Sequence, residues 1–226
     1  MRVVRGVADT RTGDGEVTKR LVEQVGAAGE PAVRVWRPDR QVAFGRRDAR
    51  ADGYRAAREA AREHGFASVE RSVGGRAVAY TGSTVAFARI EPIADIRTGL
   101  EERYEAMVSD VQRACWRLGA PAQRGEPPES FCPGAYSLQY RGKLAGVAQR
   151  VTSNAALVSG VLVVDDHREI GRVLDDVYGA LGVPFDPRSV GSLERAGATA
   201  DPVEVLSELE AALAGENHRV ESVRQT

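Results

Sequence analysis

Two runs with strand character are joined by the stretch Glu70-Arg71-Ser72-Val73-Gly74-Gly75-Arg76-Ala77-Val78-Ala79-Tyr80. Glycine has no Cβ, so Gly74 and Gly75 allow the backbone to approach an anion with several N–H groups pointing inward. Arg71 and Arg76 flank this pair and can add charge-assisted contacts. A glycine-containing hairpin with solvated arginines would show the same pattern, but the turn is long for a plain hairpin. The stretch therefore favours a binding site for a phosphate or a carboxylate.

A second informative segment is Lys143-Leu144-Ala145-Gly146-Val147-Ala148-Gln149. Lys143 and Lys19 are the two lysines of this arginine-rich chain, and Lys19 falls in an amphipathic run that predicts an exposed side chain. Lys143 opens a predicted strand among small residues, which leave room for a ligand. A cation buried there needs a partner, and a lysine can bind a carboxylate and a phosphate at once as a compact charge. The alternative is a surface turn over residues 141–143.

The periodicity of the apolar residues predicts both helices and strands. Helices are expected over residues 16–27, 54–64, 100–118, 167–181 and 201–213. Strands are expected over residues 31–36, 41–45, 67–71, 77–80, 84–90, 136–140, 143–151 and 155–164. The tail after Gly215 is expected to fray. Strands and helices alternate only in part, so we expect an α+β fold with helices mainly against one face of one mixed, largely antiparallel sheet.

The composition excludes several classes of protein. The 226 residues carry 31 basic and 32 acidic side chains, a net charge of −1, which is not the charge of a general nucleic-acid binder. No stretch approaches ~20 apolar residues, so no membrane-spanning helix is expected. Residues 1–9 lack the apolar run of a signal peptide, and we expect a cytoplasmic protein. Two cysteines and three dispersed histidines give no metal-ligand spacing, and no metal site is expected.

Taken together, the two segments resemble the catalytic domain of the lipoate–protein ligase, octanoyltransferase and biotin–protein ligase superfamily. They are most similar to the lipoate–protein ligase branch, which has an arginine, a Gly-Gly turn and Ala-Val, and much later Lys-x-x-Gly-x-Ala. Residues 71–78 and 143–149 match these motifs in type, order and separation. The resemblance implies that superfamily's fold, with an acyl-transfer catalytic domain over residues 1–182 and a C-terminal helical extension and tail over residues 183–226.

The resemblance also implies roles for the matching residues. Lys143 would reach the acyl carbonyl, where a cation stabilises the oxyanion that develops during attack by an amine. The residues that would bind the substrate or ATP are Arg71, Gly74, Gly75, Arg76, Ala77, Val78, Ala79, Gly146 and Ala148. Two departures put nearby contacts in doubt: Tyr80 stands where the ligases usually carry histidine, and Leu157-Val158-Ser159-Gly160 replaces their His-Gly segment.

The function implied is that of a lipoate–protein ligase-like enzyme. Such an enzyme uses ATP with Mg²⁺ to attach lipoate or octanoate, through an acyl-adenylate, to a lysine of a lipoyl carrier domain. The carrier would be of the 2-oxoacid dehydrogenase E2 type or the glycine cleavage H protein type. The ligases also use a small accessory domain to activate the acid, and residues 183–226 are few for that domain. Either a separate chain supplies it, or this protein does not activate the acid itself.

Cys132 distinguishes the possible mechanisms. In the cysteine-dependent octanoyltransferases of the superfamily, a thiol carries the octanoyl group taken from acyl carrier protein, and Cys132 would be that thiol. Cys132 is nearer to Lys143 in sequence than the thiol of those enzymes, so the sequence favours the ligase and leaves Cys132 as a small apolar residue beneath a proline loop. A non-catalytic relative that binds an acyl-adenylate or a carrier domain is a third alternative. Cys115 lies on an apolar helix face and is expected in the core.

Overall fold

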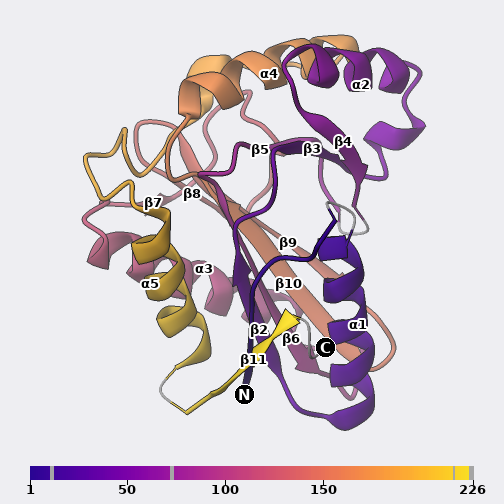
Figure 1. The fold of residues 1–226 in the computed structure, drawn as a ribbon, viewed down its shortest axis with the longest axis vertical. Helices are drawn as coiled ribbons and strands as arrows, with labels where there is room; N and C mark the ends of the chain where they lie inside the picture. The colour runs from indigo at the N-terminus through magenta and orange to yellow at the C-terminus, as the bar shows by residue number, and fades with distance from the viewer. Residues whose placement is uncertain (11–12, 72–73, 216, 224–226) are drawn as a thin grey trace.

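The computed structural model describes residues 1–10, 13–71, 74–215 and 217–223, so Ser72 and Val73 of the arginine–glycine stretch lie outside the described residues. Its largest element is an eight-stranded sheet with the strand order β11-β1-β2-β6-β10-β9-β8-β7 (Figure 1). The strands are β1 (Arg2–Arg5), β2 (Ala32–Trp36), β6 (Val85–Pro92), β7 (Gln123–Arg124), β8 (Ser137–Gln139), β9 (Lys143–Val151), β10 (Ala155–Leu162) and β11 (Arg219–Ser222). Most neighbours are antiparallel, but β1 runs parallel to β2 and β11. The predicted α+β class is confirmed.

A second, three-stranded sheet holds the strands that flank the arginine–glycine stretch. Its order is β4-β3-β5, with β3 at Gln41–Phe44, β4 at Ala67–Glu70 and β5 at Val78–Tyr80. The expectation of one sheet is therefore wrong. Alternation of apolar and polar residues predicts that a segment is a strand, but it does not determine which strands pair, because pairing depends on contacts far apart in sequence.

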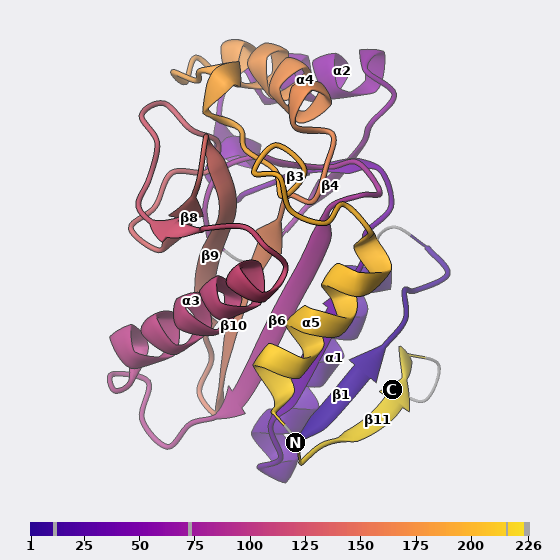
Figure 2. The same cartoon turned by 90° about the vertical axis from the view of Figure 1, so that its left-hand side faces the viewer.

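The helices cover both faces of the large sheet, which corrects the expectation that they lie mainly on one face. Figure 2 shows α3 and α5 on the near face and α1 behind the sheet. On strand β6, Phe87 packs in the cluster that contains α3 and α5, whereas Ile90 packs in the cluster that contains α1. Such alternation is what a strand buried on both sides requires. The bounds are α1 (Gly13–Ala28), α2 (Tyr54–Glu63), α3 (Leu100–Arg117), α4 (His167–Ala180) and α5 (Pro202–Ala214).

The helices α2 and α4 pack together over the small sheet, at the top of Figure 1. Two short 3₁₀ helices, η1 (Asp48–Arg50) and η2 (Pro187–Ser189), precede α2 and follow α4. The small sheet and its helices share one buried cluster, to which Val161 of β10 in the large sheet also contributes. The polar residues described below come from the β4–β5 connection, from the loop between β7 and β8, and from β9. No helix in the described ranges is long and apolar enough to cross a membrane.

The C-terminal residues are more ordered than the sequence predicts. Leu209 and Leu213 of α5 lie in the same buried cluster as α3 and the large sheet. The segment expected to fray forms β11, which pairs with β1 from Arg2–Arg219 to Arg5–Ser222. The β1 strand offers an unpaired row of backbone groups, and such an edge recruits a partner strand regardless of side-chain polarity. The predicted boundary at residue 182 stays a prediction.

Candidate functional site

A groove with a volume of about 1030 Å³ brings the two sequence motifs together. Arg71 and Gly75 enter it from the connection between β4 and β5, and Lys143 and Gly146 enter it from β9. Cys132 reaches the same groove from the loop between β7 and β8. The other predicted site residues that line the groove are Gly74, Val78 and Ala148. The side chains thus converge from segments that lie far apart in the sequence.

Ala77 and Ala79 do not line the groove, because both are buried in the core of the small sheet. The Arg76 side chain also turns away and pairs with the buried Asp48 at 2.9 Å. Its backbone N–H, in contrast, points to the groove and donates to Cys132. At position 76 the backbone N–H therefore contacts Cys132, whereas the side chain does not.

Glycine is required at two positions around Arg71, one within the turn and one on the neighbouring segment after β3. Gly75 has φ +97°, and a Cβ there would overlap Cys132 Sγ and lie 2.8 Å from Arg71 Nη2. A Cβ on Gly45, at the end of β3, would overlap the carbonyl oxygen of Gly75. A Cβ on Gly74 would meet no atom within 4 Å. The second glycine of the pair is therefore the one that allows the arginine and the cysteine to meet.

Cys132 is held with its sulfur facing two N–H donors. Arg71 Nη2 donates to Cys132 Sγ at 3.2 Å, and the Arg76 backbone N–H donates to it at 3.3 Å. The backbone of Cys132 has φ +43°, a conformation that non-glycine residues rarely adopt and that often marks a functional position. Its own N–H donates to the Tyr178 hydroxyl at 2.6 Å, and that hydroxyl donates to the carbonyl of Ala77 at 3.0 Å.

The charge around this sulfur is positive. Burial disfavours the charged form of Arg71, but the facing Cys132 sulfur opposes burial and the pKa of Arg71 is raised. Burial raises the pKa of Tyr80. A guanidinium and a backbone N–H therefore face the Cys132 sulfur, while the residue also packs against the apolar cluster of the small sheet. Its role as a nucleophile stays a prediction.

Lys143 is fully buried, so the expectation of a buried cation is confirmed and the surface-turn alternative is wrong for this side chain. Its Nζ lies 2.9 Å from both carboxylate oxygens of Glu126 and donates at 2.9 Å to the carbonyls of Phe131 and Cys132. Burial lowers the pKa of Lys143, and the charge of Glu126 partly opposes that shift. The ammonium group thus holds the backbone on either side of Cys132 in place.

Glu126 is the functional residue that sequence reasoning missed. It accepts hydrogen bonds from the hydroxyls of Ser130 and Ser137 and from the backbone N–H of Gly134 at 3.2 Å, besides its pair with Lys143. One carboxylate therefore organises the whole loop from residue 126 to residue 137. The signal available was the need of a buried lysine for a counter-charge, which points to the carboxylates of the neighbouring loop.

Apolar and aromatic side chains also line the groove. They include Trp36, Val147 and Leu157, together with Tyr104 and Tyr136, whose rings stack with centroids 4.0 Å apart. A groove that combines apolar side chains with a few convergent polar groups suits a ligand with a hydrocarbon chain and a reactive polar end. The arrangement can therefore hold an acyl chain with its carbonyl near Cys132.

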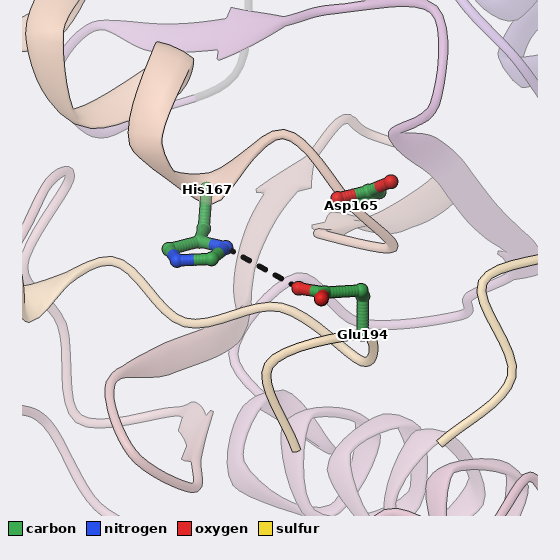
Figure 3. Close-up of side chains that lie close together, drawn as sticks. All are labelled: Asp165, His167 and Glu194. Atoms are coloured by element: carbon green, nitrogen blue, oxygen red, sulfur yellow. Dashed lines mark ion pairs between the residues drawn. The ribbon is translucent and has the colours of Figure 1, made fainter. Parts of the chain in front are cut away.

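A separate group of polar side chains lies outside the groove. Asp165, His167 and Glu194 bring one potential metal-ligand atom each to within 4.8 Å of the others (Figure 3). His167 Nδ1 lies 3.7 Å from Glu194 Oε2 and 3.2 Å from the hydroxyl of Ser192. Burial lowers the pKa of His167, and nearby arginines lower it further. These contacts explain the group as a hydrogen-bonded cluster at the start of α4.

Comparison with known proteins places this geometry in a family. The solved structure of lipoate-protein ligase A bound with ATP aligns with a TM-score of 0.72 and 19% identity over 98% of this chain and 88% of that chain, which supports a shared fold. The octanoyl-[GcvH]:protein N-octanoyltransferase of Kyrpidia tusciae is 33% identical over 166 residues, 73% of this chain and 54% of that protein. The lipoyl-[GcvH]:protein N-lipoyltransferase of Listeria monocytogenes is 27% identical over 165 residues, 72% of this chain and 59% of that protein.

The chain therefore spans little more than half the length of these two curated relatives. The family model of the lipoyl protein ligase A/B catalytic domain matches residues 16–214, which is most of the chain. The resemblance predicted from residues 71–78 and 143–149 is confirmed: the chain belongs to the lipoyl protein ligase A/B catalytic domain family.

Proposed function

We propose that this chain catalyses the transfer of an octanoyl or lipoyl group from one carrier domain to another through a thioester on Cys132. The observation that carries the proposal is the position of Cys132 Sγ, 3.2 Å from Arg71 Nη2 in a groove that is partly lined by apolar side chains. The names of the curated relatives, which act on octanoyl- or lipoyl-GcvH, support the same class of reaction. The donor would be a glycine cleavage H protein type carrier and the acceptor an E2-type lipoyl domain.

The reaction has two steps that balance without ATP. In the first, the Cys132 sulfur attacks the carbonyl carbon of the acyl-lysine on the donor; the S–C bond forms, the C–N bond breaks, and the thiol proton passes to the leaving amine. In the second, the amine of the acceptor lysine attacks the thioester; the new C–N bond forms, the C–S bond breaks, and a proton returns to the sulfur. Both steps pass through a tetrahedral oxyanion.

The groups placed to stabilise that oxyanion are Arg71 and the backbone N–H of Arg76, because both point to the space beside Cys132 Sγ. Lys143 has a different role in this arrangement. All of its hydrogen-bond donors are taken by Glu126 and by the carbonyls of Phe131 and Cys132. To reach an acyl carbonyl, as the resemblance implies, it would have to leave one of these acceptors. We therefore assign Lys143 to positioning Cys132.

A lipoate–protein ligase remains the second candidate. Its supporting observation is that Arg71 Nε is buried and has no hydrogen-bond partner among the described residues, beside the exposed Gly74 and Gly75, a combination that fits an anionic group such as a phosphate. If ATP binds, Arg71 and the backbone of Gly74 and Gly75 would hold its phosphate end, and the nucleotide would supply the energy to activate a free acid. The requirement for ATP with Mg²⁺, and for an accessory chain, stays a prediction.

The test compares the two cysteines. The protein is mixed with an octanoylated H-protein-type carrier and a bare lipoyl domain, without ATP, and intact mass spectrometry follows all three chains. We expect acyl transfer and a hydroxylamine-sensitive octanoyl adduct on Cys132. Cys132→Ala should stop transfer, whereas Cys115→Ala, the matched change in the core, should retain it. Transfer by Cys132→Ala, or a strict need for ATP, would contradict the proposal.

A further inference from the structure

A group of exposed arginines lies at the mouth of the groove and, among the described residues, forms no ion pair or side-chain hydrogen bond. Arg46 and Arg50 follow β3, and Arg58 lies on α2. All three side chains are exposed. Arg46 and Arg58 line the groove that contains Cys132, while Arg46 and Arg50 line a smaller adjoining cavity of about 340 Å³. Arg71 lines both cavities and therefore connects the three exposed arginines to the candidate site.

These arginines, which we call the mouth arginines, differ from most others in the molecule. Arg2, Arg40 and Arg89, for example, each pair with a carboxylate. Among the described residues, no ion pair or side-chain hydrogen bond involves Arg46, Arg50 or Arg58. Arg58 lies over the ring of Tyr54, with 5.7 Å between its guanidinium carbon and the ring centroid. Their charge is therefore available to a ligand or a partner.

Of the three carboxylates on the neighbouring segments, Asp48 pairs with an arginine outside this group, whereas Glu70 and Asp52 have no ion pair among the described residues. Asp48 lies within η1 but is fully buried and pairs with Arg76 at 2.9 Å. Glu70 lines both cavities and accepts a hydrogen bond from the Tyr54 hydroxyl at 2.9 Å. Asp52 is exposed in the connection to α2. The chain as a whole has a net charge of −1, so the positive charge at the mouth is a local feature and not a property of the whole surface.

We propose that Arg46, Arg50 and Arg58 form the docking surface for an acidic face of the carrier domain. This inference rests on the proposed function. An acyl group attached to a carrier lysine can reach Cys132 only if the acyl-lysine side chain enters the groove while the body of the carrier stays at the mouth. Exposed charges of one sign at such a rim attract a partner of opposite charge and orient it before contact.

The arrangement also has a kinetic consequence. Donor and acceptor carriers both need the same groove, so both must use the same mouth and bind one after the other. Each carrier should therefore inhibit the binding of the other at high concentration. The mouth arginines act on the docking of either carrier and leave the reaction at Cys132 to Arg71 and its neighbours.

The experiment measures KM for the octanoylated H-protein-type carrier and the single-turnover rate of Cys132 acylation at saturating carrier. In the double variant Arg50→Glu/Arg58→Glu we expect KM to rise by about tenfold or more and the saturated rate to change by less than about threefold. The matched control is Arg168→Glu/Arg172→Glu, which reverses two exposed charges on α4 that line neither cavity. Its KM should stay near the wild-type value.

Ionic strength provides a second readout. Raising the salt from about 0.05 M to about 0.5 M should raise the wild-type KM and have little effect on the double variant, because screening removes an attraction that the variant lacks. An unchanged KM in the double variant, or an equal rise in the α4 control, would overturn the docking surface. Binding of a short DNA duplex that the double variant loses, with an unchanged carrier KM, would assign the mouth to nucleic acid and also overturn it.

The acyl adduct separates this inference from the proposed function. If the wild type forms acyl-Cys132 and the double variant keeps its KM, the docking surface is wrong and the thioester mechanism stands. If no adduct forms on wild-type Cys132 at any carrier concentration, the proposed function itself is wrong.

Discussion

Cys115 and Cys132 carry the same side chain into two opposite environments. Cys115 lies in the last turn of α3, fully buried in the large core cluster, and burial raises its pKa to about 12. Cys132 lies half-buried in an irregular loop, with a guanidinium and a backbone N–H directed at its sulfur. The first thiol is surrounded by apolar side chains, and the second faces two N–H donors.

The difference shows how many contacts position Cys132. Cys115 requires only an apolar helix face, a local property of the sequence. Cys132 requires Lys143 and Glu126 to hold its backbone, Gly75 to admit Arg71, and Tyr178 to bind its N–H. Removing any one of these contacts should change the position or the surroundings of the Cys132 sulfur, while the surroundings of Cys115 stay unchanged.

The largest effect is expected from Lys143→Ala. The change leaves Glu126 and two carbonyls without their partner in a buried site, which typically costs about 3–5 kcal/mol of unfolding free energy when one member of a buried pair is removed. Transfer should be lost, because the loop that carries Cys132 is no longer held. Chemical denaturation and the transfer assay check this. Lys19→Ala, which removes the exposed lysine of α1, is the control for stability and should leave the unfolding free energy within about 0.5 kcal/mol.

Arg71→Met should slow transfer by about a hundredfold, the usual cost of losing one donor to a developing oxyanion. The protein should remain folded, because methionine fills a similar volume. Alkylation of Cys132 by iodoacetamide, measured by peptide mass spectrometry, tests the sulfur directly. Its rate should also be lower in Arg71→Met than in the wild type. An unchanged alkylation rate together with an unchanged transfer rate would show that Arg71 does not act on Cys132.

A smaller loss is expected from Gly75→Ala, about tenfold in transfer, with a cost of about 1–3 kcal/mol in unfolding free energy from the positive φ. The new methyl group would push Cys132 Sγ away from Arg71 Nη2. The matched change Gly74→Ala adds a methyl group to open space, so its unfolding free energy should stay near the wild-type value. Equal destabilisation by both changes would contradict the difference between the two glycines.

The smallest effect concerns Cys115 and appears only in alkali. Its folded pKa of about 12 exceeds the ordinary value of 9.0, so its thiol stabilises the fold fully below pH 9.0, and this contribution falls as the pH rises toward 12. Cys115→Ala removes this pH-dependent contribution to the unfolding free energy. The wild type should therefore lose about 2 kcal/mol more unfolding free energy than the variant between about pH 9 and pH 11. Parallel curves of unfolding free energy against pH would contradict the assignment, and transfer at neutral pH should not change.

The helices, most strands and half of the site could be predicted because their signals are local. The apolar stripe of residues 100–118 is enough for α3, and Lys143 among small residues is enough for a buried cation. The pairing of strands into two sheets was not predicted, nor was β11, because neither depends on the residues of one segment alone.

The rest of the site could not be predicted for the same physical reason. Glu126 contacts Lys143 across 17 positions, and Tyr178 contacts Cys132 across 46 positions. Gly45 is glycine because the carbonyl of Gly75 occupies the place of its side chain, a close approach that exists only after folding. Nothing in the local sequence around these residues distinguishes them from ordinary loop, helix and strand residues.

The hydrogen bond from Cys132 to Tyr178 has a consequence for hydrogen exchange. Loop amides usually exchange quickly, because small local openings expose them to solvent. The Cys132 amide instead donates to a phenol that is fully buried on α4, and burial raises the pKa of Tyr178, so the phenol keeps its proton for Ala77. Exposing this amide requires the loop to separate from α4. The amide hydrogen of Cys132 should therefore exchange as slowly as the amide hydrogens of α4, although Cys132 lies in an irregular loop.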